Sequence, residues 1–174
     1  LRQRCPPDTR TLQKGMISMK KYYLAYGSNL NVQQMKYRCP DAKPVGTAWI
    51  YGYQLMFKGS KTGSYLTIEK AENSRVPVAV WEVSEIDERR LDAYEGFPTF
   101  YYKTEMKLPM ELLKNGKTKT LTAFVYIMHE DRPLGIPSSH YVRTCVQGYR
   151  DFGFNLKYLR LAFNISERGV RNEK

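Results

Sequence analysis

Strand-like runs that follow one another directly dominate this chain, and they limit its fold more than any other feature. Short segments rich in aromatic and β-branched residues recur with turn residues between them. Strands that succeed each other without an intervening helix favour antiparallel pairing. We expect an α+β fold of about seven strands, with a sheet that curls toward a barrel. The expected strands are residues 22–26, 43–58 (bent at Gly46 and Gly52), 65–70, 78–83, 101–108 and 118–128, with a turn at 71–75.

Three or four helices are expected to accompany the strands. Ser84 and Asp87 form a capping box, and Gly96 ends the helix that they open. The apolar stripe of this helix should comprise Val83, Ile86, Leu91 and Tyr94. Ser138 should cap a later helix, and residues 155–163 should form a last short one.

The length of 174 residues fits a single domain, which we place at residues 19–165. Residues 1–18 have no apolar segment of a signal peptide, and we expect a disordered or vector-derived extension there, with the native start near Met19. Residues 166–174 should form a polar tail. No apolar run reaches the roughly 18 residues of a membrane helix, so we expect no membrane association.

The net charge of +11 raises the question of nucleic-acid binding. Both chain ends contribute to this charge, and the middle of the chain has no dense basic run. A mildly basic surface of this kind suits small anionic substrates as well as RNA. Nucleic acid is therefore a less favoured partner than a small molecule.

The cysteines and histidines give no sign of a metal centre. Cys5, Cys39 and Cys145 are widely spaced, which suggests free thiols in a reducing, cytoplasmic compartment. Cys145 lies on the apolar face of an expected helix and is more typical of a buried structural thiol than of a nucleophile. We expect no metal and no cofactor, because no cluster has the spacing of metal ligands.

A candidate binding element lies where the first strand ends, in Tyr26-Gly27-Ser28-Asn29-Leu30-Asn31. Gly and Asn adopt positive φ more readily than other residues, so a tight turn should follow the strand. Asn29 or Asn31 would cap the helix that comes next. Backbone N–H groups at such a turn can hold a carboxylate or a developing oxyanion. An ordinary strand-to-helix turn is the alternative.

A candidate acid or base is Glu95, at the last turn of the helix that Gly96 ends. A carboxylate is disfavoured near a helix C-terminus, and the aromatic neighbours would desolvate it. Both effects raise the pKa of a carboxyl group and suit it to general acid/base catalysis. The alternative is a solvated glutamate at a frayed helix end.

Taken together, three elements resemble the γ-glutamylcyclotransferase family, the AIG2-like and butirosin-BtrG-like superfamily. They are Tyr26 to Leu30, Glu95-Gly96 and the Pro-Ser-x-x-Tyr segment from Pro137 to Tyr141. The resemblance covers about residues 20–161. It implies a small, mixed, mainly antiparallel β-barrel flanked by helices.

The resemblance also implies a reaction and a set of site residues. The reaction is cyclisation of a γ-glutamyl amine or amino acid to 5-oxoproline with release of the free amine. Glu95 would be the general acid/base, and the turn from Tyr26 to Asn31 and Tyr141 would bind the γ-glutamyl group. A catalytically silent small-molecule-binding domain of the same fold and a basic nucleic-acid-binding protein remain alternatives.

Overall fold

A computed structural model describes residues 19–172 of the chain. The predictions made for residues 1–18, which include Cys5, lie outside the described residues. The strands are β1 (Lys21–Ala25), β2 (Lys43–Ser60), β3 (Gly63–Val83), β4 (Tyr101–Leu112) and β5 (Thr118–Met128). The helices are α1 (Val32–Arg38), α2 (Glu85–Glu95), α3 (Ser139–Asp151) and α4 (Lys157–Asn172), with a single 3₁₀ turn, η2 (Ser28–Leu30).

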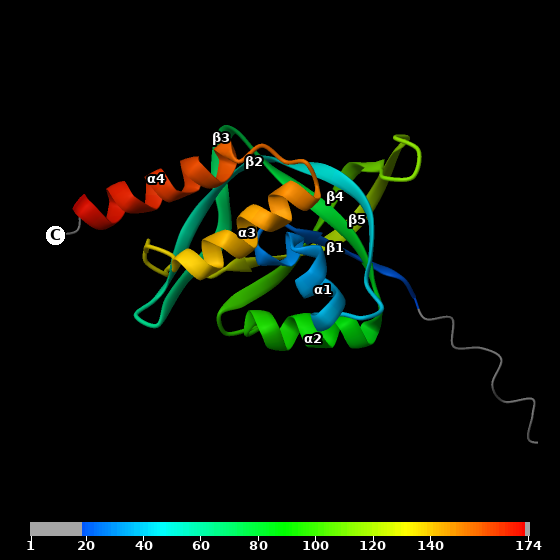
Figure 1. Ribbon diagram of the computed structural model, residues 1–174, viewed down its shortest axis with the longest axis horizontal. Helices are drawn as coiled ribbons and strands as arrows, with labels where there is room; N and C mark the ends of the chain where they lie inside the picture. Colours follow the sequence, from blue (N-terminus) through cyan, green and yellow to red (C-terminus); the bar gives the residue numbers. More distant parts are fainter. Residues whose placement is uncertain (1–18, 173–174) are drawn as a thin grey trace, which may run out of the picture.

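The strands close into a barrel in the order β1-β3-β2-β4-β5. All pairs are antiparallel except β1 with β5, where Tyr23 lies opposite Phe124 and the parallel contact closes the barrel. The helices lie on the outside, with α1 and α2 next to each other and α4 along β2 (Figure 1). The predicted mixed, mainly antiparallel barrel flanked by helices is therefore confirmed.

The barrel has fewer and longer strands than the sequence predicts. The turn predicted at residues 71–75 does not separate two strands, because β3 continues through it. The register between β2 and β3 shifts opposite this segment, between Tyr51 and Tyr53. Gly52 and Asn73 adopt positive φ there, at 75° and 58°. The two residues bend the paired strands without ending their pairing, as in a β-bulge.

The middle of the barrel is a continuous apolar core. Residues 76–81 of β3 are buried at every position, so both faces of the strand are covered there. Trp81 packs edge-on against Phe152, at the end of α3. Each large apolar side chain buried in this way contributes about 1.5–3 kcal/mol. These buried side chains therefore contribute much of the stability of the fold.

Helix α2 has the predicted limits but a different buried face. Ser84 accepts a hydrogen bond from the Asp87 amide, and Gly96 caps the helix with φ 64°, as predicted. The predicted apolar stripe is right for Val83 and Leu91, which are buried, and wrong for Ile86 and Tyr94, which are exposed. The buried residues are Asp87 and Leu91. Since residues four positions apart share a helix face, the face with residues 87, 91 and 95 is the one that packs on the barrel.

Helix α4 is longer than predicted. It runs to Asn172, so residues 166–172 form helix rather than a polar tail. Ser166 is fully buried, and its hydroxyl both accepts from the Phe57 amide and donates to the Phe57 carbonyl, each at 2.9 Å. The side chain thus satisfies two groups of β2 where the strand faces the helix.

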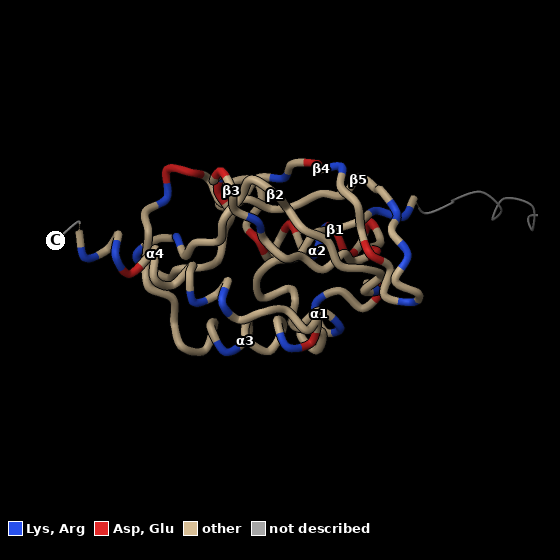
Figure 2. Tube along the Cα trace, turned by 90° about the horizontal axis from the view of Figure 1, so that it is seen from above, with Lys and Arg blue, Asp and Glu red and all other residues tan. Residues whose placement is uncertain are grey.

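No helix within residues 19–172 combines the length and the apolar character needed to cross a bilayer. Lys and Arg positions are spread along the described chain, and Asp and Glu positions lie among them (Figure 2).

Candidate active site

The turn after β1 leads directly into two short helical segments. Within it, the Leu30 amide donates to the Gly27 carbonyl and the Asn31 amide to the Ser28 carbonyl, each at 3.0 Å. Asn31 then caps α1, since its side chain accepts from the Gln34 amide. The amides of Ser28 and Asn29, at the start of η2, have no acceptor inside the helix. They are the available donors of this turn.

Gly27 serves close packing rather than a left-handed backbone. Its φ is −121°, so the prediction of a positive φ at this turn is wrong for Gly27. A Cβ at this position would lie 3.3 Å from the Tyr141 hydroxyl and 3.5 Å from Leu66 Cβ. The turn therefore approaches both α3 and β3 closely.

Glu95 reaches the turn from the end of α2. Asn29 Nδ2 donates to Glu95 Oε1 at 2.8 Å. The residue is half-buried, with its carboxyl group in a narrow pocket beside the turn. Burial raises the pKa of Glu95 to about 7, although the Arg38 charge and the Asn29 hydrogen bond lower it. At neutral pH the carboxyl can both accept and return a proton.

Tyrosines make up half of the residues that line the pocket. Tyr26 donates to the Tyr126 carbonyl at 2.6 Å, and Tyr101 donates to the Leu66 carbonyl at 2.8 Å. Burial raises the pKa of these phenols above their ordinary value, so they stay neutral at pH 7. The complete lining is Tyr23, Tyr26, Gly27, Ser28, Asn29, Leu66, Glu95, Tyr101, Tyr126 and Tyr141.

A second, wider pocket adjoins the first and opens outward. It shares Ser28 and Glu95 with the inner pocket, together with two tyrosines, and so the carboxyl lies between the two spaces. The remaining wall comes from the β2–β3 hairpin and from the segment around the end of α2. These outer residues are Ser60, Thr62, Tyr65, Ala93, Tyr94, Gly96 and Phe100.

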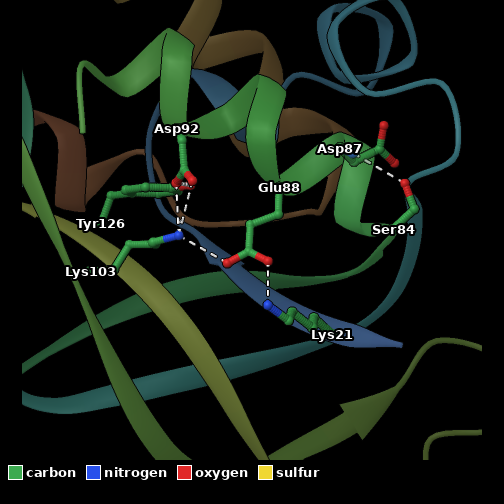
Figure 3. Close-up of polar contacts among 7 residues, drawn as sticks. All are labelled: Lys21, Ser84, Asp87, Glu88, Asp92, Lys103 and Tyr126. Carbon is green, nitrogen blue, oxygen red and sulfur yellow. Dashed lines mark hydrogen bonds and ion pairs between the residues drawn. The ribbon is translucent and has the colours of Figure 1, made fainter. Parts of the chain in front are cut away.

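Ion pairs hold α2 against the barrel (Figure 3). Lys103 of β4 lies 2.9 Å from both Glu88 and Asp92, one helical turn apart. Lys21 of β1 pairs with Glu88 at 2.5 Å. Asp92 also accepts from the hydroxyl of Tyr126, whose ring lines the inner pocket, at 2.6 Å. The network therefore fixes the helical turn that precedes Glu95.

Not all of the predicted site residues line this pocket. Tyr26, Gly27, Ser28, Asn29, Glu95 and Tyr141 do so. Leu30 and Asn31 do not: Leu30 is part of the core, and Asn31 caps α1. The close approach of Gly148, whose Cβ would lie 2.6 Å from Leu30 Cβ, explains why Leu30 is buried under α3.

Other residues of the site have no local sequence signal. Tyr23, Tyr101 and Tyr126 lie in strand patterns that equally suit core residues. Arg38 is the last residue of α1, a position where the helix dipole favours a basic residue. The sequence therefore explains Arg38 without its contact with Asn29. Within the described part of the chain, no group of His, Cys, Asp and Glu side chains is arranged to hold a metal ion.

Known proteins share this fold and sequence pattern. A family model described as "Gamma-glutamyl cyclotransferase, AIG2-like" matches residues 23–143. The chain is 29% identical over 161 residues to γ-glutamylcyclotransferase from Bos taurus, covering 87% of this chain and 81% of that protein. The Homo sapiens γ-glutamylcyclotransferase is 28% identical over 144 residues, covering 78% of this chain and 73% of that protein.

Solved structures agree with this comparison. A γ-glutamyl cyclotransferase structure superimposes with a TM-score of 0.64 at 25% identity, covering 82% of this chain and 86% of that chain. Bacillus subtilis YkqA has the same fold at 18% identity, with a TM-score of 0.65, and the match covers 84% of this chain and 55% of that chain. Because the family model spans most of the chain, from β1 through the turn at Gly27 and Glu95 into α3, the chain belongs to the AIG2-like γ-glutamyl cyclotransferase family.

Proposed function

We propose that this protein is an enzyme that cyclises a γ-glutamyl amine or γ-glutamyl amino acid to 5-oxoproline and releases the free amine. The observation that carries the proposal is the contact between the Glu95 carboxyl and Asn29 of the turn, in a pocket of neutral tyrosines. Family membership supports the same reaction class. Glu95 is the proposed general acid/base, and the part of the turn that lines the pocket, from Tyr26 to Asn29, is the proposed binding element together with Tyr141.

The substrate would span the two pockets. Its γ-glutamyl part would enter the inner pocket, which is narrow and must widen to hold it. There the amides of Ser28 and Asn29 could meet either the α-carboxylate or the developing oxyanion. Its amine part would extend into the outer pocket. The scissile bond then lies beside Glu95, which lines both spaces.

The chemistry moves two protons from the attacking nitrogen to the leaving nitrogen and exchanges one C–N bond for another. Glu95 takes a proton from the substrate's α-ammonium group, and the freed nitrogen attacks the γ-carbonyl carbon. The new C–N bond closes a five-membered ring, and the old C–N bond to the amine breaks. Glu95 gives its proton to the departing nitrogen, then takes the second proton from the ring nitrogen and passes it to the released amine, which leaves as an ammonium ion. Atoms and charge balance without any further reactant. The two reacting groups belong to one molecule, which lowers the entropic cost of their encounter.

The pKa of Glu95 suits the first proton transfer. An α-amino group has a pKa of about 7.8 and an ordinary glutamate about 4.3, so the transfer would cost roughly 5 kcal/mol in water. With a Glu95 pKa of about 7, the gap falls below one unit, or about 1 kcal/mol. Burial of the carboxyl thus removes most of this cost.

A panel of γ-glutamyl amines and γ-glutamyl amino acids tests the proposal directly, with 5-oxoproline and free amine as the measured products. We expect equal amounts of both products from at least one member of the panel. Glu95→Gln should abolish release while the protein still binds the substrate. Binding by calorimetry without any product would instead favour a catalytically silent domain, and equal turnover by the variant would remove Glu95 from the mechanism.

Location and partners follow as further proposals. Cys39 and Cys145 are buried free thiols, and burial raises the pKa of each to about 12. Thiols kept in this state suit a reducing, cytoplasmic compartment. The partner that we propose is a small γ-glutamyl compound rather than a nucleic acid or a membrane.

A further inference from the structure

The side-chain amide of Asn29 is held at all of its polar positions. Asn29 is buried, and one N–H group donates to Glu95 Oε1 at 2.8 Å. The other N–H group is within reach of the Tyr23 hydroxyl, at 2.9 Å. The amide oxygen accepts a hydrogen bond from the Arg38 guanidinium. Each end of the amide therefore has a partner of the opposite kind.

Arg38 is itself fixed by contacts on two elements. Its guanidinium carbon lies 3.4 Å from the centre of the Tyr94 ring, on α2, in a cation–π contact. Tyr94 in turn shares a hydrogen bond of 3.1 Å with Ser28 in the turn. Gln34, one turn earlier on α1, accepts a weaker bond from Arg38 at 3.4 Å. The guanidinium thus bridges α1, the turn and the end of α2.

The guanidinium allows only one orientation of the Asn29 amide. If the amide were rotated by half a turn, its NH₂ group would face the guanidinium, and two donors would meet. The amide oxygen would then face the carboxylate of Glu95, and two acceptors would meet. Both contacts would be repulsive in a site with little water.

We propose that Arg38 is a positioning residue: by holding the Asn29 amide oxygen, it keeps an N–H group on Glu95 Oε1, so that Oε2 carries the catalytic proton. This inference rests on the proposed function for the identity of that proton. Arg38 orients the carboxyl through Asn29, since no ion pair within 4 Å joins Arg38 to Glu95 in the described part of the chain. Its charge also acts on Glu95 across this distance and favours the ionised carboxylate. Glu95 thereby takes up and releases the proton on one defined oxygen.

Arg38 is the cation whose charge lowers the pKa of Glu95. Tyrosine phenols face the carboxyl from β1, β4, β5 and α3, and burial raises their pKa values, so they are neutral. On α2 itself, Asp92 is paired with Lys103 and with a phenol. The Arg38 charge opposes the effect of burial on Glu95. These phenols belong to Tyr23, Tyr26, Tyr101, Tyr126 and Tyr141.

Carbon-13 NMR titration of the Glu95 carboxyl tests this inference in the protein without substrate. The resonance is assigned by its loss in Glu95→Gln. Arg38→Gln should raise the pKa of Glu95 by about one unit, the lower end of the effect of a nearby opposite charge. Lys36→Gln removes the same charge from an exposed position of α1 and should leave the titration unchanged. Equal titrations for Arg38→Gln and wild type would overturn the proposal.

A second variant and a second measurement keep the test decisive if Arg38→Gln misfolds. Arg38→Lys keeps a cation but loses the planar guanidinium, so the Glu95 pKa should rise by less than half as much. The Asn29 side-chain protons should exchange with solvent faster than in wild type, because the amide oxygen has lost its fixed partner. Wild-type exchange together with a wild-type titration in Arg38→Lys would refute the inference.

Neither signal depends on turnover, so the two proposals fail separately. A shifted Glu95 pKa in a protein that forms no 5-oxoproline would refute the proposed function and leave the positioning by Arg38 intact. An active protein whose Glu95 titration and pH–rate profile both ignore Arg38→Gln would refute the positioning alone. In the active enzyme, the one-unit shift should lower kcat/KM at pH 7 about fivefold, because less Glu95 is ionised.

Discussion

Replacing Glu95 by glutamine should stabilise the protein at pH 8 more than at pH 5. In the folded protein the pKa of Glu95 is about 7, against about 4.3 in an unfolded chain. The folded state therefore binds a proton more tightly, and stability is lost as the pH rises from about 4 to about 7. Glutamine has the same shape and no charge, so the variant escapes this loss.

The size of the effect follows from the difference between the two pKa values. A gap of nearly three units corresponds to about 4 kcal/mol over the whole range, of which between about 2 and 3 kcal/mol falls between pH 5 and pH 8. Since Glu95 keeps some exposure, we expect about 1–3 kcal/mol. For a domain of this size, that is a difference of several degrees in Tm.

Urea denaturation of both proteins at pH 5 and pH 8 measures this difference. Subtracting the two proteins at each pH cancels the titration of all other groups. Glu105→Gln, at an exposed position of β4, is the matched control and should change stability by the same small amount at both pH values. A stability gap between wild type and Glu95→Gln that does not widen at pH 8 would refute the reasoning.

Three further changes have distinct expected outcomes. Lys103→Met removes the cation between two carboxylates of α2 and should cost about 1–2 kcal/mol; kcat should fall more than KM rises, and Lys103→Arg should restore it. Gly27→Ala places a Cβ 3.3 Å from the Tyr141 hydroxyl, so steady-state kinetics should show a several-fold higher KM with little change in Tm. Ser166→Ala leaves the Phe57 amide without its acceptor, while the Phe57 carbonyl keeps the Gly135 amide; denaturation should report a loss of about 1–3 kcal/mol, with unchanged kcat.

The parts of the structure that depend on neighbouring residues could be predicted from the sequence. Gly96 ends α2 because glycine adopts a positive φ easily, and Asn31 caps α1 because its side chain accepts a hydrogen bond from a nearby amide. Both effects act within a few positions of the chain. The turn at Gly27 and the glutamate at the helix end could be recognised for the same reason. Their meeting in space came from the family resemblance and not from either segment alone.

The parts that depend on distant residues could not be predicted. The rotation of α2 depends on the burial of Leu91 and on ion pairs with Lys21 and Lys103, which lie on two strands of the barrel. The length of α4 depends on the contact between Ser166 and β2, more than 100 residues away in sequence. Likewise, nothing near Arg38 in the sequence points to Asn29, because the contact exists only after α1 has folded back onto the turn.

The pH dependence of kcat/KM for 5-oxoproline release from the best substrate of the panel tests the central claim most directly. If Glu95 accepts the substrate's proton, kcat/KM should decrease as the pH falls through an apparent pKa near 7. Any residual activity of Glu95→Gln should not show this decrease. A wild-type profile that stays flat down to pH 5, or a Glu95→Gln variant that keeps both the rate and the step, would contradict the account.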